Sequence, residues 1–184
     1  VLIGGGIAFV GGIIWFAFWL EKKRTEAMHA FAHANGYSVD LDTAGFQAAM
    51  APYKLFNQGR GRRLKNLLRS TRGDLQIAVC DYQYTTGSGK NSHTHNQTLC
   101  VLQSAKSTLP HFFARRQIAV FDFFGKMFGG QDINFDEDPE FSKAFVLQTA
   151  TSEDELRRVF NERVRGLFPQ LGAKNSIQVE GRDG

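Results

Sequence analysis

The chain has 184 residues, of which 42% are hydrophobic and 22% charged, a composition that excludes a disordered protein and fits a globular one. Its length suffices for one domain with its own core plus a short appendage. Its two cysteines, Cys80 and Cys100, are too few for a cysteine metal set; they indicate buried free thiols, or a pair if their strands are adjacent.

Residues 1–20 contain no charged residue and no proline. As a helix they would be about 30 Å long, the thickness of a bilayer's hydrocarbon core. A cleaved signal peptide is disfavoured, because the aromatic end of this segment runs directly into charged residues without a cleavage site. Lys22, Lys23 and Arg24 follow it and fit the positive-inside rule. We expect a single-pass anchor in a bacterial cytoplasmic membrane, with the C-terminal part in the cytoplasm.

Small residues recur every four positions along the predicted anchor, at Gly4, Ala8 and Gly12. This spacing lets a second helix approach closely, so the three residues are candidate contacts with a partner in the membrane. The alternative is equally favoured, because glycine is common in transmembrane helices.

After the anchor, residues 21–36 predict a juxtamembrane helix that ends at Asn35 and Gly36, and residues 37–184 predict one cytoplasmic α+β domain. His29 and His33 have the spacing of metal ligands on a helix. No third ligand accompanies them, so exposed polar positions are favoured. Residues 42–51 predict a short helix that ends before a proline.

A basic run follows. Residues 21–72 carry ten Lys and Arg against four Asp and Glu, and Arg60, Arg62 and Arg63 belong to a dense part of this excess. Anionic inner-leaflet lipid or an acidic partner subunit would fit these charges. No aromatic residues are interleaved with the arginines, so nucleic acid is not expected as a partner. A solvated face is the commonest alternative.

The sequence YTTGSGK at residues 84–90 resembles the end of a phosphate-binding loop, which needs two glycines, Lys and Ser or Thr between a strand and a helix. Here Tyr84 occupies the place of the first glycine and Asn91 that of the hydroxyl residue. Residues 74–86 and 94–104 both alternate with a period near two, which predicts strands on both sides of the loop. The glycines therefore predict the turn of a long β-hairpin.

His93 and His95 would lie on the same face of the second hairpin strand. A zinc site would need one more ligand, and Asp81 on the first strand is the only local candidate. Exposed polar positions at the end of a hairpin are favoured instead, and no metal or other cofactor is expected.

Residues 111–116 predict a strand, and residues 117–128 predict a helix that is apolar nearly all round. Such a helix is either fully buried or offers a contact surface to a membrane or a partner; the second is slightly favoured, with Phe121, Phe124 and Phe128 as candidate contact residues.

Possible calcium ligands alternate at Asp132, Asn134, Asp136 and Asp138, but the positions where a calcium loop needs Gly and Glu hold Glu137 and Lys143. A strand over residues 132–136 is expected. Residues 145–149 predict a further strand, and residues 176–180 a last one. Between them Ser152 and Glu155 form a capping box that predicts a helix to about residue 168, closed by Pro169. The expected buried stripe of this helix is Leu156, Val159, Phe160, Val164 and Leu167, and the expected outward residues are Arg157, Arg158, Glu162 and Arg165.

Several of these stretches together, LFNQGRGRRLKNLLR, DYQYTTGSGKNSHTHNQT, TLPHFFARR, GGQDINFDEDPEFSKAF and SIQVEG, resemble a family of uncharacterised bacterial proteins. The resemblance covers most of residues 50–181, and the DYxYTTGSGK…QT hairpin is its most specific part. It implies an N-terminal transmembrane helix and a cytoplasmic α+β domain. It implies no activity and no catalytic residue, and it implies that a further strand and helix usually follow VEG.

No nucleophile with a paired base, no carboxylate pair and no metal set is recognisable, so no catalytic residue is expected. The favoured function is a non-catalytic accessory subunit of a larger bacterial membrane complex, by analogy a respiratory or photosynthetic one. A free membrane-tethered module that senses or binds a lipid or ligand is the first alternative. A metal-dependent hydrolase that uses His93, His95 and Asp81 is the second.

Overall fold

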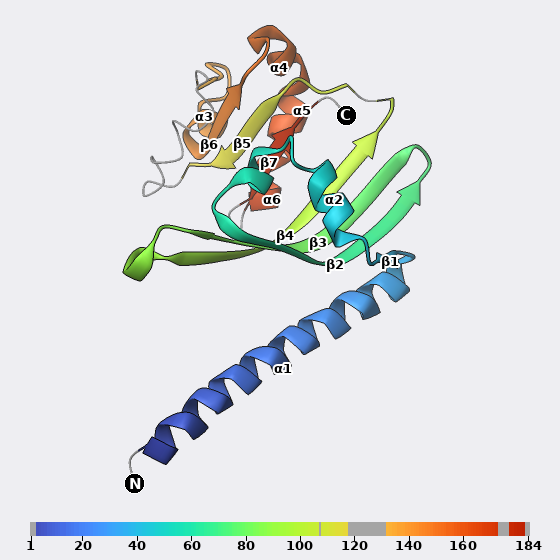
Figure 1. The fold of residues 1–184 in the computed structure, drawn as a ribbon. Helices are drawn as coiled ribbons and strands as arrows, with labels where there is room; N and C mark the ends of the chain where they lie inside the picture. The colour runs from blue at the N-terminus through green and yellow to red at the C-terminus, as the bar shows by residue number, and fades with distance from the viewer. Residues whose placement is uncertain (1–2, 107, 118–131, 173–176, 183–184) are drawn as a thin grey trace. The chain divides into compact units, whose positions relative to one another are not determined.

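The computed structural model describes residues 3–106, 108–117, 132–172 and 177–182, with side chains described from Phe16 onward in the first helix and up to Gln170 in the last. The chain forms two compact units, Val1–Ser104 and Ala105–Gly184, which are described separately. Both combine antiparallel sheet with helices, so the predicted α+β fold class is confirmed (Figure 1).

The first unit begins with one continuous helix, α1 (Ile3–Asn35). It includes both the predicted anchor and the predicted juxtamembrane helix. Gly36 follows with φ of +69°, and the N–H of Tyr37 donates to the carbonyl of Ala32 at 2.9 Å. Glycine adopts this left-handed conformation without the steric cost of a Cβ atom. The predicted helix end is therefore confirmed.

Four antiparallel strands follow in the order β1-β2-β3-β4. Their bounds are Ser38–Asp40 for β1, Arg60–Arg72 for β2, Leu75–Thr86 for β3 and His93–Ser104 for β4. β3 and β4 are the two strands that the alternating pattern predicts. The arginine-rich residues 60–72 form β2. The sequence pattern predicts no helix or strand for them.

Helices cover both faces of this sheet (Figure 1). On one face lie α2 (Thr43–Ala49) and the short 3-10 helix η1 (Lys54–Asn57). The side chain of Asp42 caps α2 by accepting from the N–H of Gly45 at 2.8 Å, which agrees with the predicted short helix. The core on this face consists of Phe46, Met50, Phe56, Leu64, Leu67, Ala78, Cys80, Tyr82 and Tyr84.

The β3–β4 turn confirms that YTTGSGK belongs to a hairpin. Gly87 and Gly89 have φ of +73° and +53°, and the 3-10 turn η2 (Gly89–Asn91) leads directly into β4. A Cβ atom on Gly87 would lie 2.1 Å from the carbonyl oxygen of Asn91, so glycine is required there for space as well as for conformation. The strand after the loop replaces the helix that a phosphate-binding loop needs.

In its described residues, the second unit has a three-stranded antiparallel sheet in the order β6-β5-β7 with four short helices. The strands are β5 (Phe112–Arg116), β6 (Phe145–Thr149) and β7 (Gln178–Gly181). The helices are α3 (Pro139–Ala144), α4 (Glu153–Val159), α5 (Glu162–Arg165) and α6 (Phe168–Gly172). Its core is rich in phenylalanine and consists of Phe112, Ala114, Ile133, Phe135, Phe141, Phe145, Leu147, Leu156, Phe160 and Phe168.

The strand expected over residues 132–136 is wrong. Asp132 forms only an isolated bridge with Gln148, whose side chain donates to the Asp132 carboxylate at 2.7 Å. The chain then turns into α3, where the side chain of Asp138 accepts from the N–H of Phe141 at 3.1 Å. The acidic residue that ended the calcium-like pattern is therefore a helix cap.

The helix that Ser152 opens is shorter than expected. Ser152 does cap it, accepting from the N–H of Glu155 at 3.4 Å. The helix ends at Val159, however, because Asn161 adopts extended backbone and caps α5 by accepting from the N–H of Val164. Pro169 lies within α6 instead of closing a long helix.

This break reorients the residues that follow it. Leu167, expected in the buried stripe, is 50% exposed, whereas Arg165, expected to point outward, is only 6% exposed. The 3.6-residue period predicts a buried face only while the helix is unbroken, so the prediction is wrong for Arg165 and Leu167. Beyond the break, Val164 still packs against the core and Glu162 is exposed, as predicted. The helix expected over residues 117–128, with Phe121, Phe124 and Phe128, lies almost wholly outside the described residues.

Candidate functional site

The first unit exposes a group of large apolar side chains on α1. We name Phe16, Phe18, Trp19 and Leu20 the aromatic collar. Each is between 42% and 68% exposed. The rings of Phe16 and Trp19 stack with centroids 5.9 Å apart, and the ammonium of Lys23 lies 6.0 Å from the Trp19 ring. Large aromatic residues next to a cation are typical of a helix segment at a membrane interface or in a protein contact.

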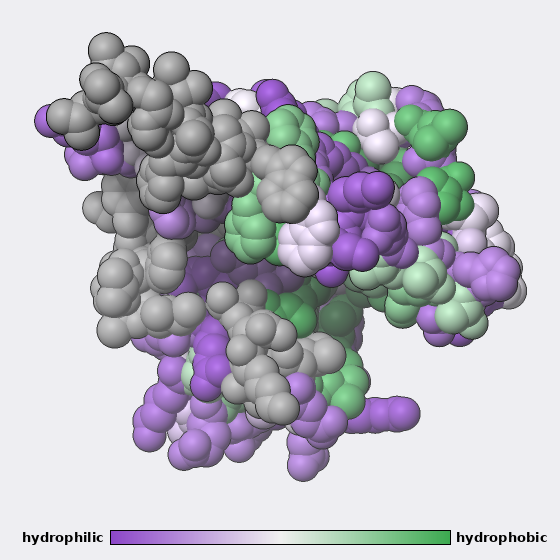
Figure 2. Space-filling view, turned by 90° about the horizontal axis from the view of Figure 1, so that it is seen from below, coloured by the Kyte–Doolittle hydropathy of each residue, from purple (hydrophilic) through white to green (hydrophobic). Residues whose placement is uncertain are grey.

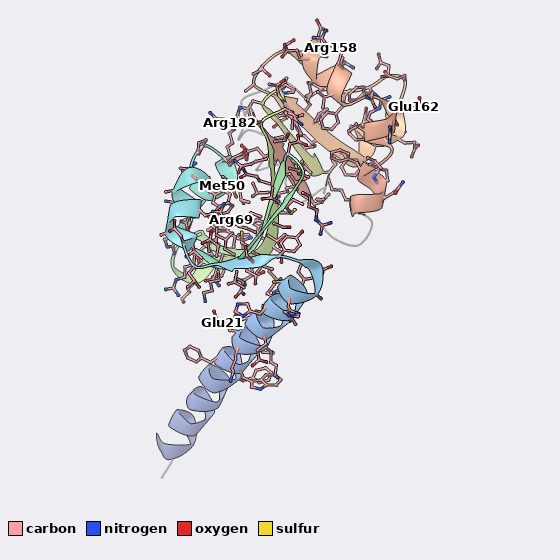
Figure 3. All side chains as sticks on the ribbon, turned by 90° about the vertical axis from the view of Figure 1, so that its right-hand side faces the viewer. Glu21, Met50, Arg69, Arg158, Glu162 and Arg182 are labelled. Atoms are coloured by element: carbon pink, nitrogen blue, oxygen red, sulfur yellow. The ribbon has the colours of Figure 1, made fainter. Side chains whose placement is uncertain are left out.

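The next turn of α1 is bound to the sheet by polar contacts, and Figure 3 labels Glu21 at this place. Arg24 donates to both carboxylate oxygens of Asp81, through Nε at 3.1 Å and Nη2 at 2.8 Å. Nη2 also donates to the hydroxyl of Thr98 at 2.9 Å, and Glu21 forms an ion pair with Lys65 of β2. A two-point contact between guanidinium and carboxylate fixes orientation as well as distance.

A bulge in β2 brings a further hydrogen-bond donor, Asn66, to Asp81. The register between β2 and β3 shifts between Lys65 and Leu68, and Asn66 has φ of +51°. This conformation lets the Asn66 side-chain amide donate to Asp81 Oδ2 at 2.9 Å. Bulges commonly redirect a side chain in this way, and asparagine tolerates left-handed backbone better than most residues.

Apolar contacts continue the attachment along α1. Met28 and Ala32 are buried against Leu68, whose side chain is fully buried. Tyr37 and Val79 pack against the same cluster. We name the whole attachment the junction: Glu21, Arg24, Met28 and Ala32 of α1 with Lys65, Asn66, Leu68, Asp81 and Thr98 of the sheet.

Electrostatics favour the charged form of Asp81. Its partial burial raises the pKa, but the hydrogen bonds from Arg24 and Asn66 and the positive charge of Arg24 outweigh that effect and lower the pKa overall. In return, hydrogen bonding to Asp81 raises the pKa of Arg24. The junction is thus a charged, directional contact beside the aromatic collar.

The basic residues predicted to contact lipid or a partner differ in their surroundings. Arg24 is bound in the junction. Arg60 donates to the carbonyl of Gly87 and to the Ser92 hydroxyl, and so ties the hairpin turn to the start of β2. Arg62 donates to the carbonyl of Phe56 at 3.1 Å. These three arginines therefore hold the first unit together, whatever else they contact.

Three further cations of that set are more accessible. Lys22 and Lys23 have side chains 77% and 58% exposed, and each lies within 4.0 Å of Glu26. Arg63 is exposed. Exposed ion pairs of this kind contribute little free energy, so all three cations remain accessible for an anionic surface. Figure 2 shows hydrophilic residues intermixed with groups of hydrophobic ones over the coloured part of the face that it draws.

The histidine pairs do not assemble a metal site. His93 and His95 share a face, as predicted, with ring centroids 4.7 Å apart. Asp81 is opposite Thr98 in the β3–β4 register, whereas His95 is opposite Tyr84, so the carboxylate projects from the other face of the sheet. Its proposed role as a third ligand is wrong. The described residues contain no group of three potential ligands.

His95 instead takes part in a polar and aromatic stack. Its ring lies 4.7 Å from that of Tyr84, and its Nε2 is 2.8 Å from the hydroxyl of Thr86. Burial and the neighbouring His93 lower the pKa of His95. His29 and His33 are exposed on α1, in agreement with the favoured interpretation as polar positions.

Cys80 and Cys100 lie on adjacent strands but point to opposite faces. Cys80 is opposite Leu99 and Cys100 is opposite Val79, and both thiols are free. Burial raises the pKa of the Cys80 thiol to about 12, which leaves it inert.

Part of the predicted membrane contact lies beyond the described side chains. Gly4, Ala8 and Gly12 belong to the α1 backbone, but their side chains are outside the described residues. Among the residues whose side chains the structure describes, which begin at Phe16 in α1, no helix is both long and apolar enough to cross a membrane.

The junction itself was not anticipated, although one signal pointed to it. Asp81 is the only charged residue in the twelve-residue strand β3. An isolated carboxylate among alternating apolar and polar residues needs a partner, and the sequence does not indicate which cation supplies it. Comparison with known proteins adds no further indication: no family model matches the chain, and no curated protein and no solved structure is significantly similar to it.

Proposed function

We propose that the chain is a non-catalytic, membrane-anchored accessory subunit of a larger bacterial membrane complex. One observation carries the proposal: the aromatic collar, Phe16 to Leu20, is exposed immediately before the residues that bind α1 to the sheet. A soluble helix rarely exposes four consecutive or nearly consecutive large apolar side chains unless lipid or another protein covers them.

The uncharged sequence of residues 1–20 supports the same proposal. It is long enough to cross a bilayer as a helix, and Gly4, Ala8 and Gly12 would give a second helix a close approach. The collar would then lie at the cytoplasmic interface, where Trp is enriched.

The junction would serve to hold the sheet in a fixed orientation to that interface. Arg24 lies four residues after Leu20, and four helical residues advance only about 6 Å. The sheet therefore begins about one helical turn from the end of the apolar segment. A short, rigid connection suits a subunit that presents one surface to a fixed partner, whereas a freely mobile module would need a flexible linker.

The alternative is a free membrane-tethered module that binds anionic lipid. The exposed cations Lys22, Lys23 and Arg63 favour it. Such binding would weaken steeply with salt, because exposed charges are screened within about 8–10 Å at ordinary ionic strength.

Affinity capture of the full-length chain from native membranes in a mild detergent tests the proposal. We expect stoichiometric recovery with other membrane proteins. Phe18→Glu should remove them by placing a charge in the collar, and Leu41→Glu, at a leucine that is 90% exposed outside α1, should not. Recovery of the wild-type chain alone, as a monomer or homodimer, would overturn the proposal. Salt-sensitive flotation with phosphatidylglycerol vesicles would then support the lipid-binding alternative.

A further inference from the structure

The outer strand of the first sheet has a long edge that no second strand pairs with among the described residues. β4 forms one end of the strand order, and in the described part of the chain only β3 pairs with it. All twelve residues of β4 are in continuous register with β3, without a bulge. A straight edge of this length presents a row of backbone donors and acceptors that another strand is able to pair with.

The composition of β4 contains none of the usual protection. Its sequence, HTHNQTLCVLQS, has no Lys, Arg, Asp, Glu or Pro. Exposed residues occur along its whole length, and Leu102 is 59% exposed. Natural sheets usually guard such an edge with a charge, a proline, a bulge or a very short strand.

The other sheet edges are poorer candidates. β1, at the opposite end of the same sheet, has three residues. In the second unit the outer strands β6 and β7 have five and four residues. The longest of these outer strands, β4, is therefore the one that lacks charged residues, proline and a bulge.

We propose that β4 pairs antiparallel with β4 of a second copy of the chain, around a two-fold axis perpendicular to the sheet. An antiparallel edge is self-complementary under such an axis. Because β4 carries no Lys, Arg, Asp or Glu, pairing it with itself brings none of these charges face to face, whereas a strand with charges of one sign would repel its own copy. The pairing joins two four-stranded sheets into one.

The register follows from the alternation of side chains. Opposed residues must face the same side of the sheet, so their numbers differ by an even amount. Maximal overlap places the axis at Thr98 or at Leu99 and pairs eleven of the twelve residues of each copy. An antiparallel pair of that length forms about ten backbone hydrogen bonds. Cys100 then lies opposite the partner's Asn96 or the partner's Thr98.

This arrangement goes beyond the proposed accessory function and does not depend on it. Two copies paired through β4 would be found within a larger complex or without one. The test therefore uses the purified full-length chain in detergent micelles, where membrane partners are absent. It measures which strand forms the contact, by cross-linking from defined cysteine positions, and not only the mass of the assembly.

The two Cys100 thiols would be separated by either two or four residues along the strand, roughly 7 or 14 Å. A bismaleimide of that span should link them into a dimer on a denaturing gel. Cys100→Ser should abolish the product, because Cys80 is fully buried. The position control combines Cys100→Ser with Ser38→Cys, which moves the thiol to an exposed site on β1 at the far edge of the sheet; it should yield little dimer.

Asn96→Pro and Gln97→Pro provide the second test. Backbone N–H directions alternate along a strand, so one of these two residues points its N–H away from β3 and tolerates proline. The variant with the wild-type melting temperature should lose cross-linking about tenfold, because the ring obstructs the outer edge. Equal cross-linking from Cys100 and from Ser38→Cys, a monomeric wild-type chain, or a folded proline variant that cross-links normally would each overturn the proposal.

Discussion

Arg24 and Asp81, 57 residues apart in the chain, meet through two hydrogen bonds of 3.1 and 2.8 Å, and this contact fixes α1 to the centre of the first sheet. Asn66 and Thr98 donate to the same carboxylate, so Asp81 collects hydrogen bonds from α1, β2 and β4 at once. The residue joins three segments that are far apart in the sequence.

A double-mutant cycle measures this contact. Arg24→Ala and Asp81→Ala should each lower the free energy of unfolding by about 1–2 kcal/mol, with a coupling energy of about 1 kcal/mol, since Arg24 is half-exposed and solvent weakens the ion pair. Arg24→Lys should restore little, because an ammonium does not make the two-point contact. Lys22→Ala, which removes a highly exposed cation, should change stability by less than about 0.5 kcal/mol. Additive single mutations would show that the contact contributes nothing.

The pH dependence of stability should follow Asp81. The fold lowers the pKa of this carboxyl below its unfolded value, which is about 3.9. The resulting stabilisation is therefore fully present above about pH 5 and is lost as the pH falls through the lower folded pKa. Unfolding free energies measured by denaturant titration should decline in acid, and Asp81→Asn should flatten the decline. Asp136→Asn, at an exposed position, is the control; an equal effect of both variants would contradict the assignment.

Among the polar side chains of the second unit, Arg165 should contribute most to the free energy of unfolding. Its guanidinium is 6% exposed, donates to Asp138 at 2.9 Å and to the carbonyl of Phe160 at 2.8 Å, and lies 4.3 Å from the centre of the Phe135 ring. Arg165→Ala should cost about 2–4 kcal/mol, because it leaves the buried carbonyl of Phe160 and the partly exposed carboxylate of Asp138 without this donor, and it removes a cation–π contact. Arg163→Ala, two residues away and exposed, should cost less than about 0.5 kcal/mol in the same thermal melts.

The thiols should differ in reactivity. Cys80 is fully buried with a pKa raised to about 12, whereas Cys100 is exposed on the opposite face of the sheet. Iodoacetamide should therefore alkylate Cys100 alone in the native chain, and both residues after unfolding. Peptide mass spectrometry distinguishes the sites. An intramolecular disulfide formed under mild oxidant would contradict the opposed orientation of the two side chains.

The sequence predicted those elements whose signals are local. Alternation marked β3 and β4, and the glycines between them marked the turn. Ser152 was recognised as a helix cap because the cap and its partner, Glu155, are three residues apart. In each case the determining residues lie within one element or at its end, so no tertiary information was needed.

Elements that depend on tertiary contacts were missed. β2 contains two register shifts and two positive-φ residues, Gly61 and Asn66, which interrupt the period-two pattern. The long helix expected after Ser152 is interrupted because Asn161 caps a new helix, and Arg165 of that helix donates to the carbonyl of Phe160. Predicting the junction would have required knowing which face of the sheet each residue of β3 occupies. The same information shows that Asp81 and the two histidines lie on opposite faces.

The most direct test of the membrane-anchored account uses the two tryptophans of the chain, Trp15 and Trp19, which both belong to α1. Intrinsic tryptophan fluorescence therefore reports on the collar region alone. If the collar occupies the membrane interface as proposed, the full-length chain reconstituted in phospholipid vesicles should show blue-shifted emission that lipids with brominated acyl chains quench and aqueous iodide does not. Emission typical of water, quenched by iodide and unaffected by brominated lipid, would contradict the account.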